Sequence, residues 1–171
     1  MSTWQAGGRQ LLRASALSML HEPPDHAPYG WSHCLTMPQA VLGVAAACAD
    51  PTRAFAVAAT HVVGFRAALG QTALPDRYEP EPPGVDLVTA LRSDPSRAAT
   101  AMWHTPTDGV VAAVTDLAGR AAVHHDAHLV KYTLACLDAA DWDREHARLY
   151  RSAAAALHTY WTIADQANQL A

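Results

Sequence analysis

The stretch HHDAHLVK, residues 124–131, concentrates the side chains that could do chemistry. If it is helical, His124, His128 and Lys131 stand at positions i, i+4 and i+7 and share one face of the helix. Two neutral imidazoles at this spacing can reach the same transition-metal ion without backbone strain. The pattern therefore predicts a metal site built on His124 and His128.

Lys131 gives this face a second chemical property. It is the one lysine among the twelve basic residues of the chain, the other eleven being arginine. Arginine keeps its proton, whereas a desolvated lysine can lose it and act as a base or nucleophile, or take up carbon dioxide as a carbamate that offers an oxygen to a metal. We expect Lys131 to be a base or a carbamate ligand, and both roles stay open at this point.

Length and composition predict a single all-helical domain over residues 1–171. Half of the residues are apolar and only 7% are aromatic, with alanine the commonest type, which suits closely packed helices. The histidine content is unusually high for a chain of this length: ten histidines supply many candidate ligands or proton carriers. The three cysteines are an odd number without C-x-x-C spacing, which favours reduced thiols in the cytoplasm over a disulfide framework.

Charge and hydropathy argue against two classes of partner. The net charge is −4, and no basic stripe interleaved with aromatic residues occurs, which argues against nucleic acid. No stretch reaches roughly 18 uninterrupted apolar residues, and the N-terminal segment lacks the pattern of a signal peptide. We therefore expect a cytoplasmic protein that acts on a small molecule and does not associate with a membrane.

Apolar periodicity and capping signals predict where the helices lie. The expected helices cover residues 3–20, 36–49, 51–70, 85–92, 94–104, 107–119, 120–140 and 142–164. No segment shows the period-two alternation of a strand, so the predicted fold class is an all-α bundle of six to eight helices. Residues 1–29 should form an N-terminal helix and loop, and the proline-rich residues 71–84 an extended surface loop that could close as a lid.

Two further histidines lie where they could join the site. Thr36 and Gln39 have the spacing of a capping box and predict a helix start, so His33 lies just ahead of that start. There it either faces a cavity or packs against Trp31, and both interpretations stay open. His61 lies in the next helix, which we expect to be largely buried because nearly all of its residues are apolar.

Two segments resemble the C-terminal half of questin oxidase-like proteins. Residues 30–40 read GWSHCLTMPQA and residues 124–137 read HHDAHLVKYTLACL, the latter with the more specific form D-x-H-x-[IV]-K-x-T-x-A-x-L. The resemblance extends from about residue 30 to the end of the chain. It implies an all-helical oxidative enzyme acting on aromatic polyketides such as anthraquinones, as part of secondary metabolism, by Baeyer–Villiger-type or ring-cleaving oxygenation. The cofactor implied is NADPH or non-heme iron, and the site residues carried over are His33, His124, His128 and Lys131.

The chain departs from that family in its length. Family members are usually much longer, and their N-terminal half carries further histidines in segments that are not found here. Either His61, His21 or His26 replaces those ligands, or a second chain completes the site, as a homodimer or with another protein, or activity has been lost.

We therefore expect a non-heme iron oxidoreductase or oxygenase for a small aromatic substrate of the polyketide or quinone type. His124 and His128 would bind Fe(II), and His33 and His61 would complete the set of imidazoles, with an open position for dioxygen. The side chains expected to form the substrate walls are Trp31, Trp103, Tyr132 and Trp161.

Two other functions remain as alternatives. A non-catalytic helical subunit or small-ligand binding module, working with a partner chain, would hold no metal tightly and would tolerate His128→Ala. Metal-dependent hydrolysis would need Asp126 as a ligand, but on an ideal helix Asp126 points well away from His124 and His128.

Overall fold

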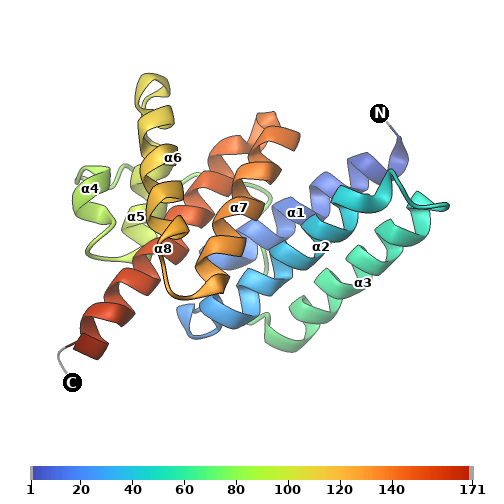
Figure 1. The fold of residues 1–171 in the computed structure, drawn as a ribbon, viewed down its shortest axis with the longest axis horizontal. Coiled ribbons are helices and arrows are strands. Elements are labelled where there is room, and N and C mark those ends of the chain that lie inside the picture. Colours follow the sequence, from blue (N-terminus) through green and yellow to red (C-terminus); the bar gives the residue numbers. More distant parts are fainter. Residues whose placement is uncertain (1, 170–171) are drawn as a thin grey trace.

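The computed structural model describes residues 2–169, and this part of the chain is helical without any strand (Figure 1). The eight α-helices are α1 Thr3–His21, α2 Ser32–Ala45, α3 Pro51–Leu69, α4 Leu87–Ala90, α5 Pro95–Trp103, α6 Thr107–Ala122, α7 Ala127–Trp142 and α8 Ala147–Gln169. Short helical turns over Pro24–His26, Ala27–Trp31 and Arg144–His146 link some of them. The prediction of a single all-α domain with six to eight helices is confirmed.

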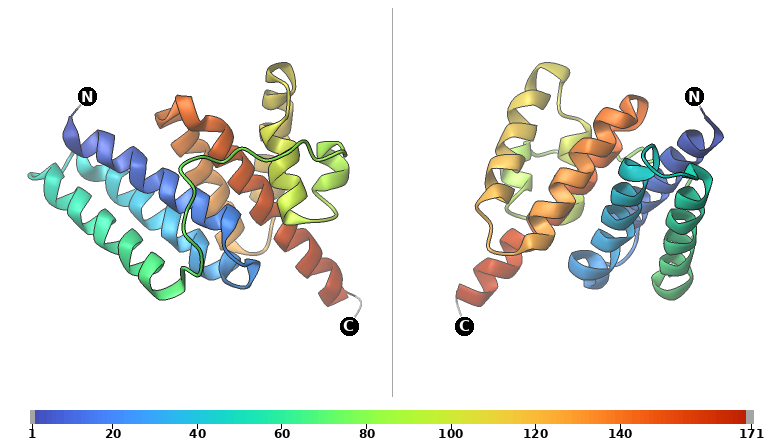
Figure 2. Two further views of the ribbon diagram at one scale, coloured as in Figure 1. Left: turned by 180° about the vertical axis from the view of Figure 1, so that it is seen from behind. Right: turned by 45° about the vertical axis from the view of Figure 1, so that its right-hand side comes forward.

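The helices form two groups that pack along α7 and α8. Helices α1, α2 and α3 run side by side, α7 and α8 lie next to them, and α4, α5 and α6 lie on the far side of α8 (Figures 1 and 2). Alanine makes this packing close: α8 buries Ala153, Ala154 and Ala155 completely, and α5 buries Ala98 and Ala99. Such small side chains let the two helix backbones approach each other closely.

Aspartate followed by proline starts two of these helices, as the sequence predicts. Asp50 accepts hydrogen bonds from backbone N–H groups in the first turn of α3, and Asp94 does the same in the first turn of α5. In both helices proline occupies the first position, where its missing N–H group would have no partner within the helix.

The predicted start of α2 at Thr36 is wrong. The chain is already helical from Ala27, so α2 begins at Ser32 and Pro38 lies inside it. A proline there cannot donate to the carbonyl four residues earlier, that of Cys34. The hydroxyl of Ser15 on α1 lies 2.8 Å from that carbonyl oxygen and 2.9 Å from the Leu11 carbonyl oxygen, so its proton is shared between the two and a contact between helices partly replaces the missing bond.

Helix α3 is less buried than predicted. Only Ala58 and Val62 are buried, whereas Val57 and Val63 are 52% and 64% exposed. The reason is position: α3 lies at the edge of the molecule and packs one stripe of residues against α1 and α2 (Figure 2).

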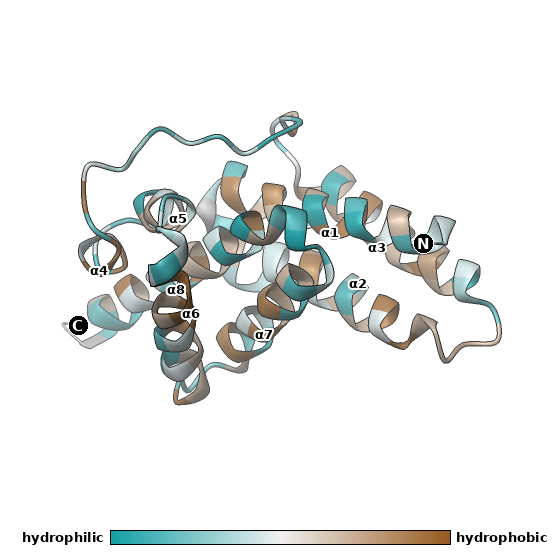
Figure 3. Cartoon of the chain, turned by 90° about the horizontal axis from the view of Figure 1, so that it is seen from above, coloured by the Kyte–Doolittle hydropathy of each residue, from teal (hydrophilic) through white to brown (hydrophobic). Residues whose placement is uncertain are grey.

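The proline-rich segment is a surface loop, as predicted, and runs outside the helices between α3 and α4 (Figure 3). The buried carboxylate of Glu22 fixes its beginning, because it accepts from the backbone N–H of Gln71 at 2.9 Å and pairs with Arg66. Farther along, the ring of Tyr78 packs edge-on against Trp103, with centroids 5.2 Å apart. These contacts attach the loop to the helices, and a lid function stays a prediction.

Candidate functional site

The predicted helix over residues 120–140 is interrupted at the histidines. Helix α6 ends at Ala122 and α7 begins at Ala127, so His124 lies in the connecting loop and not one turn before His128. The break follows from Asp126, whose backbone is extended and whose Oδ1 accepts from the His128 backbone N–H at 2.7 Å, the bond of an N-cap residue. The prediction that the two histidines share a helix face is therefore wrong.

Asp126 also orients the imidazole of His128. Its Oδ1 lies 2.8 Å from His128 Nδ1, and because a carboxylate only accepts, Nδ1 carries the proton. The other ring nitrogen, Nε2, is then free to accept a proton or bind a metal. Burial by itself would raise the pKa of Asp126, but hydrogen bonds from the backbone and the imidazole of His128 outweigh it and lower the pKa below its usual range. A carboxylate that orients a histidine in this way is typical of metal sites.

His33 lies beside this pair, as the sequence predicts. The His33 and His128 ring centroids are 5.1 Å apart, and Tyr29 packs edge-on against His128 at 4.8 Å. Burial, with the electrostatic influence of the neighbouring His128, Lys131 and His61 side chains, lowers the pKa of His33 below its usual value, so its imidazole is neutral at pH 7.

The two remaining predicted ligands lie less favourably. His61 places Nε2 3.2 Å from the backbone carbonyl oxygen of His33, and since a carbonyl only accepts, His61 uses that nitrogen as a donor. It supports the backbone at His33 rather than joining the imidazoles. Lys131 is exposed, so this chain alone does not provide the desolvation that a base or carbamate role needs.

A second group forms where α8 passes the loop between α6 and α7. Asp165 of α8 places one carboxylate oxygen 3.0 Å from His124 Nε2 and the other 3.9 Å from His125 Nε2. The two imidazoles are stacked with centroids 4.4 Å apart. Among the residues that the structure describes, this is the group of three whose candidate ligand atoms all lie within 4.8 Å of one another.

The hydrogen bonds of His124 determine which of its nitrogens is protonated. The backbone N–H of Asp126 donates to His124 Nδ1 at 3.0 Å, so Nδ1 is unprotonated and the proton sits on Nε2, where it bonds Asp165. A metal on Nε2 would require the proton to leave, and a move to Nδ1 would break the bond from Asp126, at a cost of about 1 kcal/mol. That cost is small beside the roughly 10–16 kcal/mol that zinc-finger peptides release on binding zinc, and two imidazoles with a carboxylate are donors that divalent transition metals accept. The donor set therefore fits a divalent metal.

The predicted aromatic walls do not meet at one place. Trp31 and Tyr132 are completely buried in the core and cannot line an open site, and Trp103 packs against the proline-rich loop. Of the four, Trp161 adjoins the histidines, with its ring 5.6 Å from that of His124. The exposed Tyr29 lies edge-on to Trp161 at 6.1 Å and was not predicted.

The side chains around His128 and the group of His124, His125 and Asp165 are contiguous, and we refer to them together as the histidine patch. It comprises Tyr29, His33, His124, His125, Asp126, His128, Trp161 and Asp165. Sequence reasoning did not single out Asp165, which lies 41 residues after His124. Its one local signal is the position four residues after Trp161, which places both on one face of α8.

In comparisons with protein-family models, with curated proteins and with solved structures, nothing matches this chain. Within residues 2–169, each helix is too short or too polar to cross a membrane.

Proposed function

We propose that this chain binds a divalent transition metal, Fe(II) above all, through His124, His125 and Asp165, and that it oxidises a small aromatic molecule. The observation that carries the proposal is the group of two imidazoles and one carboxylate whose ligand atoms lie within 4.8 Å of one another. Two histidines and one carboxylate with open positions are the ligand set of non-heme Fe(II) oxygenases. Bound iron would supply the means to activate dioxygen beside an electron-rich ring.

The neighbouring side chains would handle the substrate and its proton. His128 has its Nδ1 proton bonded to Asp126, so its free Nε2 can accept the proton of a phenol. Trp161 and Tyr29 offer flat apolar surfaces for an aromatic ring. The resemblance to questin oxidase-like proteins supports the same substrate class, aromatic polyketides and quinones. An oxygenase that inserts one atom of dioxygen needs two further electrons, for which we propose NADPH.

A partner chain is part of the proposal because the site is open. The side chain of His125 is 71% exposed and Tyr29 is 55% exposed, so solvent reaches the ligand group from one side. A second copy of this chain, or another chain, would cover it and exclude water. The same exposure favours the alternative function, a non-catalytic subunit or small-ligand binding module that works through a partner.

Metal binding tests the ligand set directly. Protein purified without an affinity tag is titrated with Fe(II) in the absence of oxygen, and bound metal is measured by elemental analysis after gel filtration. We expect about one equivalent per chain, and an affinity lower by at least about 10–100-fold in Asp165→Asn and His125→Ala. The matched control is His104→Ala, which removes an exposed histidine that is bonded to the Pro80 carbonyl at 2.8 Å. A native chain that binds no metal, or an equal loss in the control, contradicts the proposal and favours the non-catalytic subunit.

Two further variants separate ligands from proton carriers. His128→Ala should keep the metal and lose oxygen uptake with phenols and quinones, whereas loss of the metal would favour His128 as a ligand over the proposed set. Lys131→Arg keeps the charge and forbids both the carbamate and the base role. It should bind metal like the native chain, and unchanged oxygen uptake would exclude Lys131 from the chemistry.

A further inference from the structure

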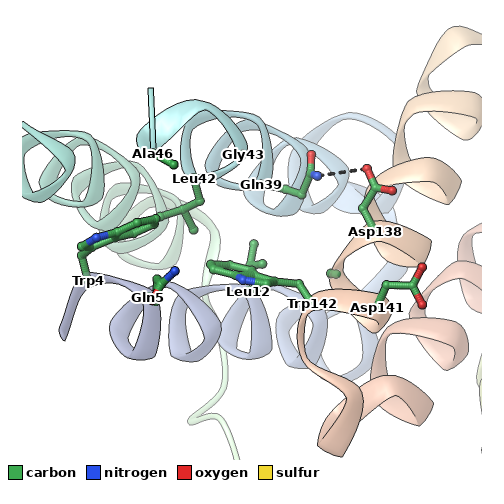
Figure 4. A pocket seen from close by; sticks show the side chains of 11 residues that line it. Trp4, Gln5, Leu12, Gln39, Leu42, Gly43, Ala46, Asp138, Asp141 and Trp142 are labelled. Atoms are coloured by element: carbon green, nitrogen blue, oxygen red, sulfur yellow. Dashed lines mark hydrogen bonds between the residues drawn. The ribbon is translucent and has the colours of Figure 1, made fainter. Parts of the chain in front are cut away.

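A cavity of about 550 Å³ opens between α1, α2 and α7, at the other end of α7 from the histidine patch (Figure 4). His128 and Asp141 are separated along α7 by about 20 Å, given the rise of an α-helix. The cavity is therefore a separate place in the fold. Its volume lies within the range of small-molecule sites in proteins.

Two indole rings form much of its wall. Trp4 near the start of α1 and Trp142 at the end of α7 both lie along the space between α1 and α2 (Figure 4). The Trp142 ring packs on Gly8 of α1, because it lies 3.0 Å from the position that a Cβ on Gly8 would take, beside Leu42 at 3.1 Å. Tryptophan is the side chain that attracts cations most strongly over its face.

The polar part of the wall is negative. Asp138 and Asp141 lie at the α7 end, and none of the residues that line the cavity is basic. Gln39 donates to Asp138 Oδ2 at 3.2 Å, which positions the carboxylate without neutralising it. The guanidinium of Arg9 lies 5.9 Å from the Trp142 centroid, but Arg9 does not line the cavity.

We propose that this cavity binds a small organic cation, a quaternary ammonium or a bulky protonated amine with an apolar body. The indoles would contact the apolar groups and attract the charge, and the exposed carboxylates of Asp138 and Asp141 would add an electrostatic attraction at the α7 end. A neutral ligand of the same shape gains only the free energy of the apolar contacts, and the carboxylates repel an anion. The proposal of a cation site does not rest on the proposed metal site, and an experiment can contradict either proposal without affecting the other.

Gly43 provides a variant that narrows the cavity without disturbing the fold. It lies in the α2 wall, and a Cβ there would meet nothing within 4 Å. Gly43→Leu therefore places an isobutyl group at the cavity wall, where it competes with a ligand for space, and it also improves helix propensity. Gly64→Leu is the matched control, because Gly64 lies in α3, outside the cavity, and a Cβ there also meets nothing within 4 Å.

Calorimetric titration with choline and with its neutral isostere 3,3-dimethylbutan-1-ol tests the proposal. We expect saturable binding of choline, at least tenfold weaker binding of the alcohol, loss of choline binding in Gly43→Leu and native binding in Gly64→Leu. Asp141→Asn should weaken choline binding several-fold and reduce its dependence on salt. Absent binding of choline, equal binding of the alcohol, or native binding in Gly43→Leu would each overturn the proposal.

Discussion

The N-cap at Asp126 is the contact that most directly links the fold to the histidine patch, and its removal has a calculable effect. One oxygen of Asp126 accepts from the backbone N–H of His128 at 2.7 Å and from its Nδ1 at 2.8 Å. Asp126→Ala removes the cap and should lower the free energy of unfolding by about 1 kcal/mol, within a range of roughly 0.5–2. For a chain of this length that corresponds to a fall in Tm of about 2–4 °C. Asp126→Asn keeps an acceptor oxygen and should lose only a few tenths of a kcal/mol.

The effect of Asp126→Ala should depend on pH in a defined direction. Because the folded chain lowers the pKa of Asp126, the carboxylate stabilises the fold fully above its unfolded pKa, about 3.9. That stabilisation is lost as the pH falls through the lower folded pKa. The difference between the native chain and Asp126→Ala should therefore shrink below about pH 4.

Urea unfolding followed by circular dichroism at pH 7 and at pH 3 measures both effects. Asp76→Ala is the control, since Asp76 is exposed in the proline-rich loop, and its change should stay within about 0.5 kcal/mol. Native stability of Asp126→Ala at pH 7, or a difference that widens at low pH, would refute the capping role.

Two further predictions concern the packing of α1 against the C-terminal end of α7. The carboxylate of Asp143 is 1% exposed and accepts from the Arg13 guanidinium at 2.6 and 2.8 Å. Because the Arg13 side chain is 18% exposed and keeps part of its hydration, Asp143→Asn should cost about 1.5–3 kcal/mol in urea unfolding. A loss below 1 kcal/mol would contradict this. A Cβ on Gly8 would lie 3.0 Å from the Trp142 ring, so Gly8→Leu should destabilise by about 1–3 kcal/mol. Gly119→Leu, at a helical position with nothing within 4 Å, should be neutral or stabilising in the same urea unfolding measurement.

The elements that the sequence predicted well depend on contacts within one helical turn. Asp50 and Asp94 cap α3 and α5 as expected, because the side chain and the N–H groups that it satisfies are only two or three residues apart. The same local rule was available at Asp126, but the spacing of His124, His128 and Lys131 at i, i+4 and i+7 suggested a continuous helix there. In the folded chain α7 packs on α2 and α8, with Leu129 its first buried residue, and such contacts between helices are not contained in a local sequence pattern.

Contacts between distant segments account for the rest of the errors. Asp165 reaches His124 only because α8 crosses beneath the loop between α6 and α7. We predicted that Trp31 and Tyr132 line a substrate site. An aromatic residue on an apolar helix face can line a cavity or fill the core, and the sequence pattern is the same in both cases. Their complete burial is decided by how tightly the alanine-rich helices close around them.

Asp126 determines which ring nitrogen carries the proton in both His124 and His128. The backbone N–H of Asp126 donates to Nδ1 of His124, and its carboxylate accepts from Nδ1 of His128, so the two imidazoles are held in opposite tautomers. His128 therefore presents a free nitrogen, while His124 must give up or move a proton before its Nε2 can bind a metal. Residue types and spacing do not distinguish these states, because both histidines flank the same aspartate. The assignment of His128 as the proton acceptor and His124 as a metal ligand thus follows from the turn at Asp126 and not from the histidines themselves.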